Sequence, residues 1–344
     1  MSWAKISLLL AIIALIHVVV IYGCVYADED EMSRQEEVDP ALAQALFDHI
    51  FTEKSAEDEA GKDSAGIPKS KSWDYSRTLQ LPAPLARQAA KARSVIIVDL
   101  ATRRVLYEKN SRDKVAIASL TKLMTLLVVS DQMTVKKELT WDSEVKISRE
   151  AASVENARLK RDTYTVKDLV YSMMVGSFND AATQLAITSH GNTGNFVAAM
   201  NQRAADMGFT KARFNSPSGL PQGTKRENSC ASAAEILYLC EAVMKNPELK
   251  KICGTPRYVL SRGSKRDGVR EIGSSNLMIN GRNVPGAFGF KTGYTNAAGR
   301  CVAFGIERNG RIVICCITGY PSNENNALFD FGTALANWAF KQDR

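Results

Sequence analysis

Short runs rich in Val, Ile and aromatic residues lie near both ends of the chain, whereas apolar residues in the middle recur at helical spacing. The first pattern predicts β-strands and the second predicts helices. The predicted strands cover residues 94–100, 104–109, 287–295, 300–306 and 311–318. The predicted helices cover residues 119–129, 165–174, 180–187 and 325–340, with further helical segments as far as Met244. Strands at both ends with helices between them indicate one α+β domain, in which an antiparallel sheet is flanked by helices and a helical lobe is inserted.

Two short signals refine this pattern. Asn309-Gly310 separates the last two predicted strands, and this dipeptide favours the tight turn of a β-hairpin. Thr165 precedes Asp168 by three residues at the start of a predicted helix, which is the spacing of a reciprocal capping box. We therefore expect a hairpin at 309–310 and a capped helix that begins after Thr165.

The first 27 residues differ in kind from the rest. Lys5 precedes an uncharged, mostly apolar run over residues 6–23, and Ala27 is followed by four acidic residues. This order is typical of a secretory signal peptide cleaved after Ala27. An uncleaved signal anchor is an alternative, since a run of this length also suffices to span a bilayer, and a lipoprotein signal at Cys24 is another. All three place the remaining chain outside the cytoplasm.

Residues 28–81 are rich in Glu, Asp, Lys, Ser and Ala, so they bury little apolar surface and predict an acidic and polar, largely flexible linker. The folded domain is therefore expected over residues 82–344. The chain has a net charge of +7 although residues 28–39 are acidic, so the domain itself is cationic. A cationic body is attracted to anionic polymers or membrane surfaces. No basic-aromatic stripe or reading helix indicates nucleic acid.

The chain has only three histidines, which disfavours hydrolase mechanisms that use histidine as the base. His17 lies in the export signal, His49 precedes the predicted domain and His190 lies at the end of a predicted helix. A Ser-His-Asp triad would depend on His190 alone. No His, Cys or carboxylate cluster has the spacing of zinc ligands, so we expect neither a metal nor another cofactor. The seven cysteines form no Cys-x-x-Cys motif, and we interpret those in apolar runs as buried thiols.

A lysine can replace histidine as a base when burial or a neighbouring cation makes its amine neutral. Ser-x-x-Lys on a helix suits this chemistry, because it places both side chains on one face. The pattern occurs four times, beginning at Ser2, Ser111, Ser119 and Ser143. Only Ser119 with Lys122 opens a strongly apolar helix, and taken alone that serine is most simply an N-cap.

Two further motifs follow in sequence order. Ser177-Phe178-Asn179 lies between two predicted helices, where a hydroxyl and an amide can point into a cleft, although Ser-x-Asn recurs at residues 274–276. Lys291-Thr292-Gly293 occurs once, at the end of a predicted strand. Such a strand can pair with an extended peptide, while Lys and Thr bind a carboxylate and Gly permits close approach. An ordinary Gly-rich strand is the alternative.

These three motifs in this order mark penicillin-binding proteins and class A β-lactamases. The residues around them resemble one branch, the low-molecular-mass serine-type D-alanyl-D-alanine carboxypeptidases, over roughly residues 82–341. The stretches that carry the resemblance are Ala118–Thr125, Asp168–Ala182, Phe214–Pro221 and Gly289–Gly299. The resemblance implies a β-lactamase/transpeptidase-like fold and action on peptidoglycan stem peptides. It also implies acylation by β-lactam antibiotics and a location in the periplasm or cell envelope.

The resemblance further implies a role for each motif residue. Ser119 attacks the terminal D-Ala–D-Ala bond, Lys122 accepts its proton, and Ser177 passes a proton to the departing D-Ala. The backbone N–H groups of Ser119 and Tyr294 form the oxyanion hole. Lys291 and Thr292 bind the terminal carboxylate. The substrate-binding residues implied in this way are Asn179, Lys291, Thr292, Gly293 and Tyr294.

Some alternatives stay open. A D,D-endopeptidase that cuts peptidoglycan cross-links would use the same motifs. Phe178 stands where the family usually has Gly, which would crowd the cleft and favours a catalytically weak protein that only binds cell wall or penicillin. Ser218 replaces a frequent His. A class A β-lactamase is disfavoured, because no Glu-x-x-Leu-Asn stretch lies between the second and third motifs. The chain stops soon after its last predicted helix, so membrane attachment is expected only through the N-terminus.

Overall fold

The computed structural model describes residues 72–343 apart from residues 136 and 138. Its helices are α3 (Ala83–Lys91), the 3₁₀ helix η2 (Ala118–Thr121), α4 (Lys122–Val135), α5 (Arg149–Ser153), α6 (Val166–Met174), α7 (Asn179–His190), α8 (Thr193–Asp206), α9 (Ala233–Met244), α10 (Pro247–Cys253) and α11 (Asn325–Ala339). Its strands are β1 (Ser94–Asp99), β2 (Val105–Lys109), β3 (Val115–Ala116), β4 (Glu144–Lys146), β5 (Thr163–Thr165), β6 (Cys230–Ala231), β7 (Arg257–Val259), β8 (Glu271–Gly273), β9 (Ala287–Thr295), β10 (Gly299–Arg308) and β11 (Arg311–Tyr320). The predicted export segment 1–27 and most of the predicted linker lie outside the described residues.

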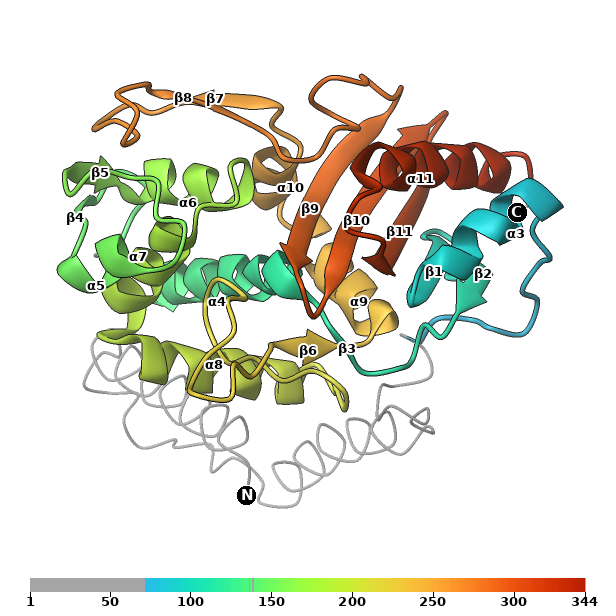
Figure 1. Ribbon diagram of the computed structural model, residues 1–344, viewed down its shortest axis with the longest axis horizontal. Coiled ribbons are helices and arrows are strands. Elements are labelled where there is room, and N and C mark those ends of the chain that lie inside the picture. The colour runs from blue at the N-terminus through green and yellow to red at the C-terminus, as the bar shows by residue number, and fades with distance from the viewer. Residues whose placement is uncertain (1–71, 136, 138, 344) are drawn as a thin grey trace, which may run out of the picture. The chain divides into compact units, whose positions relative to one another are not determined.

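Five strands form the main sheet in the order β2-β1-β11-β10-β9, and each neighbouring pair is antiparallel. Two of these strands precede the helical lobe in sequence and three follow it, as Figure 1 shows. The predicted α+β fold with an inserted helical lobe is therefore confirmed. Asn309 and Gly310 have φ angles of 50° and 70° and join β10 to β11, which confirms the predicted hairpin.

Each face of the sheet packs against its own helices, because side chains alternate along a strand. Val95 and Ile97 belong to the apolar cluster formed with α3 and α11. Ile96 and Val98 belong to the larger cluster formed with the helical lobe. Figure 1 shows α11 over the sheet on the first side, and α9 contacts β1, β10 and β11 from the other.

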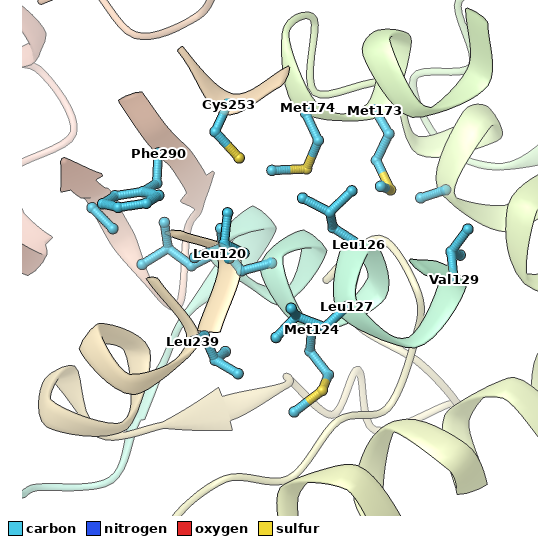
Figure 2. Packing of buried hydrophobic residues seen from close by; sticks show 14 of the residues in the cluster. Leu120, Met124, Leu126, Leu127, Val129, Met173, Met174, Leu239, Cys253 and Phe290 are labelled. Atoms are coloured by element: carbon cyan, nitrogen blue, oxygen red, sulfur yellow. The ribbon is translucent and has the colours of Figure 1, made fainter. Parts of the chain in front are cut away.

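Helix α4 is the central helix of the lobe, and all its residues from Lys122 to Val129 are buried. A helix that is apolar around its whole circumference packs inside a protein rather than at its surface. Figure 2 shows Leu126 of α4 next to Met173 and Met174 of α6, with Leu239 of α9 on another side. Ser119 lies in the 3₁₀ turn that leads directly into this buried helix.

The folded part begins earlier than the predicted residue 82. Trp73 is only 3% exposed, its ring stacks on Tyr238 of α9 with centroids 4.6 Å apart, and the Arg103 guanidinium lies 4.3 Å from its ring centroid. Residues 72–81 thus pack on the domain although their composition is polar. One large aromatic side chain buries enough surface to anchor the segment, which a composition average does not reveal.

The predicted capping box at Thr165 is only half formed. The Thr165 hydroxyl accepts a hydrogen bond from Asp168 N at 3.0 Å, as expected. The Asp168 carboxylate turns away and accepts four hydrogen bonds from Tyr258, Ser261 and Arg262. It thereby holds α6 to β7 and to the segment that follows it. None of the helices in the described part of the chain is long and apolar enough to cross a membrane.

Candidate active site

Ser119 lies in the 3₁₀ turn η2, immediately before α4. The preceding Ala118 has a φ of 46°, a conformation that is strained for a residue with a side chain. In a 3₁₀ turn the side chains at positions i and i+3 lie on the same side. The Ser-x-x-Lys spacing therefore places the Lys122 amine beside the Ser119 hydroxyl, although the α-helix itself begins only at Lys122.

Lys122 is fully buried, and its Nζ atom has three polar neighbours. The atom lies 2.9 Å from Ser119 Oγ and 2.8 Å from both Asn179 Oδ1 and the carbonyl oxygen of Ser218. Burial, and then the charge of Lys291, lowers the pKa of the Lys122 amine well below its usual value. A neutral amine donates two hydrogen bonds to the two carbonyl oxygens and keeps its lone pair for the Ser119 hydroxyl.

Both ends of the Asn179 amide are engaged, which fixes its orientation. Its oxygen accepts from Lys122, and its nitrogen donates to the carbonyl oxygen of Glu155 at 2.9 Å. The Glu155 loop is held in turn by the buried carboxylate of Asp180, whose Oδ2 accepts from the backbone nitrogens of Arg158 and Leu159 at 2.6 Å. The second N–H of Asn179 remains for a ligand.

Phe178 does not crowd the site. Its ring is only 5% exposed and belongs to the apolar core of the lobe. A Cβ atom built on Gly176 would lie 2.5 Å from that ring and 2.7 Å from Ile272, so the ring fills the space beside a glycine. Ser177 has a φ of 60° and lines the cavity at Ser119. The expected obstruction by Phe178 is therefore wrong, because the aromatic ring turns inward while its neighbour Ser177 faces the cavity.

Strand β9 passes the N-terminal end of α4 at very short range (Figure 1). A Cβ atom on Gly293 would lie 2.9 Å from the Ser119 nitrogen, so only glycine permits this approach. Thr292 Oγ1 lies 2.6 Å from Ser275 Oγ at the cavity wall. Lys291 is 1% exposed and donates to the carbonyl oxygen of Thr292 at 3.0 Å. Burial lowers the pKa of Lys291 to about 7.

Two open cavities meet at Ser119 and share Asn179 and Tyr294 as walls. The first has a volume of about 350 Å³, and its other polar walls are Ser177, Ser275, Thr292, Arg300 and Asn325. The second has a volume of about 380 Å³, and its other polar walls include Glu155, Asn156, Arg226, Asn228 and Asn296. All eight residues singled out from the sequence therefore lie at or directly behind one site. Lys122 and Lys291 are the two that line neither cavity, since both are buried behind the walls.

Arg300 is the residue that the sequence motifs do not indicate. Its guanidinium donates to the carbonyl oxygen of Ser322 at 2.7 Å and to Asn325 Oδ1 at 3.1 Å, and it lies 5.3 Å from the centroid of the Tyr294 ring. No carboxylate of the described residues forms an ion pair with it. The first cavity thus contains an oriented cation without a counter-charge, which favours an anionic ligand group.

In the described part of the chain, neither a histidine base nor a metal site accompanies Ser119. His190 ends α7, where it lies edge-on to Phe196 with ring centroids 5.1 Å apart, and it is not a wall of either cavity. No three His, Cys, Asp or Glu side chains within residues 72–343 are grouped as metal ligands would be. A serine beside a buried lysine, whose pKa is lowered by burial, is the reactive arrangement that the site provides.

Comparison with known proteins agrees with this geometry. The sequence model of the peptidase S11 family, described as D-alanyl-D-alanine carboxypeptidase, matches residues 81–321. That range contains Ser119, Lys122, Lys291 and most of both cavity walls. The chain belongs to the peptidase S11 family. The S11 relationship also explains why the three motifs meet around Ser119.

Individual S11 relatives are distant. The D-alanyl-D-alanine carboxypeptidase DacF of Bacillus subtilis is 28% identical over 258 residues, which are 74% of this chain and 63% of DacF. A D-alanyl-D-alanine endopeptidase of Pseudomonas aeruginosa is 30% identical over 64% of this chain and 68% of its own length. The crystal structure of penicillin-binding protein D2 from Listeria monocytogenes, with ampicillin bound, has a TM-score of 0.63 and 27% identity. The aligned region covers 73% of this chain and 98% of the chain of penicillin-binding protein D2.

Proposed function

We propose that this chain is a serine-type D-alanyl-D-alanine carboxypeptidase that removes the terminal D-Ala from peptidoglycan stem peptides through an acyl-enzyme. The observation that carries the proposal is the 2.9 Å contact between Ser119 Oγ and the buried Nζ of Lys122. Because burial lowers the pKa of Lys122, this amine is available as the base that a serine nucleophile needs. Family membership and relatives named carboxypeptidases support the same activity.

In the acylation step, Ser119 Oγ attacks the carbonyl carbon of the penultimate D-Ala while its proton passes to Lys122 Nζ. The negative charge that forms on the carbonyl oxygen is stabilised by the backbone N–H groups of Ser119 and Tyr294. The C–N bond then breaks, and Ser177 relays a proton to the departing amine of D-Ala. Water hydrolyses the remaining ester in the second step, which releases the shortened peptide and restores Ser119.

The terminal carboxylate of the substrate belongs in the first cavity. Thr292, with Ser275 beside it, supplies hydroxyl groups there, and Arg300 supplies an unpaired cation. Lys291 acts from behind Thr292 through its charge, since it is buried and its nitrogen lies 3.0 Å from the Thr292 carbonyl oxygen. Asn179 offers its remaining N–H to the substrate backbone. Arg300 thus adds to the carboxylate-binding residues expected from the motifs.

The mass of the intact domain, measured after brief exposure to penicillin, tests the nucleophile. The parent protein should gain one penicillin adduct, whereas Ser119→Ala should gain none. An adduct on Ser119→Ala would contradict the assignment. Release of free D-Ala from a synthetic peptide ending in D-Ala-D-Ala then tests the activity itself.

A D,D-endopeptidase is the second candidate, because two S11 relatives carry that name. Both activities share the acyl-enzyme, so digestion of purified cross-linked dimers decides between them. The binding-only alternative loses its main support, since Phe178 lies in the core and not in the cleft. Either enzyme would work on the cell wall, and we propose that the protein is exported. Tethering by residues 1–27 stays a prediction about a segment outside the described residues.

A further inference from the structure

The hairpin formed by β7 and β8 has two different faces. Its strands pair with Tyr258 opposite Ile272 and Val259 opposite Glu271. Tyr258 stacks on Tyr171 of α6 with ring centroids 4.1 Å apart, and Ile272 is only 2% exposed, so this face packs on the helical lobe. Because side chains alternate along a strand, Val259 and Glu271 belong to the opposite, outer face. Figure 1 shows the hairpin above α6, at the other end of the domain from α3.

The hairpin exposes two apolar side chains. Val259 is 62% exposed, and Val269, two residues before Glu271, is 49% exposed. They are two of the four most exposed large apolar residues in the described part of the chain, and a third is Tyr294 at the active site. A single exposed valine is ordinary on a protein surface, whereas two on one hairpin indicate contact with a partner.

The same region is rich in basic residues. Residues 257–271 contain five Lys and Arg, and residues 158–161 contain three more. The two segments lie side by side, because Lys160 N donates to the Ser264 carbonyl oxygen at 3.2 Å and Arg266 N donates to the Arg158 carbonyl oxygen at 2.8 Å. Eight cations from segments that are distant in sequence are thus brought together by backbone contacts.

Most of these cations have no counter-charge. Arg257, Arg262 and Lys265 each form an ion pair with a nearby carboxylate. The other five are exposed and form no ion pair with any of the described residues. They are Arg158, Lys160, Arg161, Arg266 and Arg270. Together with Val259 and Val269 they form what we call the hairpin surface, which combines unpaired positive charge with exposed apolar groups.

We propose that the hairpin surface docks the protein on a bilayer that contains anionic phospholipids. Its cations bind the headgroup phosphates, and its two valines enter the boundary between the headgroups and the acyl chains. A soluble polyanion would satisfy the cations alone, because it offers no apolar region for Val259 and Val269. The sequence predicts membrane attachment only through the N-terminus, so the hairpin surface is a second contact, and it does not depend on the reaction at Ser119.

Co-sedimentation with lipid vesicles tests the proposal. Residues 28–344 are used, so that the predicted export segment contributes no binding of its own. This chain contains both apolar clusters and the whole main sheet, and therefore the complete described domain. We expect it to bind vesicles that contain phosphatidylglycerol and not vesicles of phosphatidylcholine alone, with binding that weakens as salt is added. Equal binding to both kinds of vesicle, or binding to neither, would overturn the proposal.

Paired substitutions then locate the contact. Lys160→Gln with Arg161→Gln removes two cations of the hairpin surface and should weaken vesicle binding about 20-fold, because each cation near an anionic bilayer contributes about fivefold. Arg87→Gln with Lys114→Gln is the matched control, since both are exposed cations outside the hairpin surface that form no ion pair with the described residues. It should change binding by about twofold at most. Equal losses in the two double variants would show a general attraction of the cationic domain and refute the proposal.

The valines separate a membrane from a soluble polyanion. Val259→Ser with Val269→Ser leaves every charge in place and should weaken vesicle binding about tenfold, while binding to soluble inorganic polyphosphate stays unchanged. If this variant binds vesicles as tightly as the parent protein, the contact is one of charge alone, and the membrane proposal is wrong. Urea unfolding of each variant at the parent midpoint shows that the fold is intact. Release of D-Ala by the same variants should equal that of the parent protein, so failure of the proposed reaction and failure of docking are separate results.

Discussion

Replacement of Gly293 by Ala tests whether β9 fixes the backbone of the nucleophile. The added Cβ atom would lie 2.9 Å from the Ser119 nitrogen and 3.2 Å from both Ala118 Cβ and the Ile117 carbonyl oxygen. Ordinary contact begins at 3.4 Å. The strand and the turn before α4 must therefore separate by about 0.5 Å, and neither is a flexible side chain that can swing away.

The magnitude follows from what this displacement moves. In the proposed mechanism the Ser119 and Tyr294 N–H groups bind one oxygen, and loss of one such donor costs about 10²- to 10³-fold in rate. A displacement of about half an ångström removes part of this rate enhancement, so we expect acylation to slow about 30- to 100-fold. Overpacking at one position should lower the free energy of unfolding by about 1–3 kcal/mol.

The assay is the second-order rate of covalent labelling by a fluorescent penicillin, measured beside urea unfolding of the same variant. Gly194→Ala is the control, because Gly194 lies in the first turn of α8 and its nearest neighbour would be a side-chain oxygen of Asn192 at 3.2 Å. That variant should label at the parent rate, and its free energy of unfolding should change by about 1 kcal/mol or less, because only the Asn192 side chain that caps α8 must shift. If folded Gly293→Ala labels as fast as the parent protein, the claim that β9 positions the oxyanion hole is refuted.

Three further results are expected. On the acid side the acylation rate should rise with pH as Lys122 loses its proton, because burial lowers the pKa of its amine. Above pH 7 the rate should fall as Lys291, with a pKa of about 7, loses its charge. A rate that rises continuously to pH 10 would contradict both pKa shifts. Asp168→Ala should lower the free energy of unfolding by at least about 3 kcal/mol in urea, since it leaves four donors unpaired, and a loss below about 1 kcal/mol would show that they find other partners. Gly176→Ala should lower the free energy of unfolding by about 1–3 kcal/mol, because the added methyl group contacts the Phe178 ring. In a double-mutant cycle, Phe178→Ala should recover part of this loss. If the two losses in free energy are additive, the ring does not lie beside Gly176.

Much of the fold could be predicted because its signals are local. The apolar runs of β1 and β9–β11 and the Asn309-Gly310 turn depend on neighbours in sequence, and their observed bounds differ from the prediction by at most two residues. The contact between the two side chains of Ser-x-x-Lys could be predicted for the same reason, since a single turn brings them together. Local signals failed for Trp73, where one side chain outweighs the polar composition around it.

The rest of the site could not be predicted, because its contacts join segments that are distant in sequence. Ser275 belongs to the second Ser-x-Asn stretch, for which the sequence predicts no role, yet its hydroxyl oxygen lies 2.6 Å from Thr292 Oγ1. Ser218 contacts Lys122 through its backbone carbonyl, which any residue supplies, so the departure from His has little direct consequence for that contact. Arg300 stands out only when the fold shows that it has no counter-charge.

The order of strands in the main sheet has a consequence for how the protein is made. β1 pairs with β2 and with β11, and Ser94 faces Thr318 across that second pairing. During synthesis, β1 and the helical lobe emerge long before β9–β11. Ser119 therefore appears without Gly293 beside it, and the pocket closes only when the last hairpin docks. Chains that end before β9 should therefore be inert in the proposed reaction, and the site becomes complete only when the last hairpin has been added.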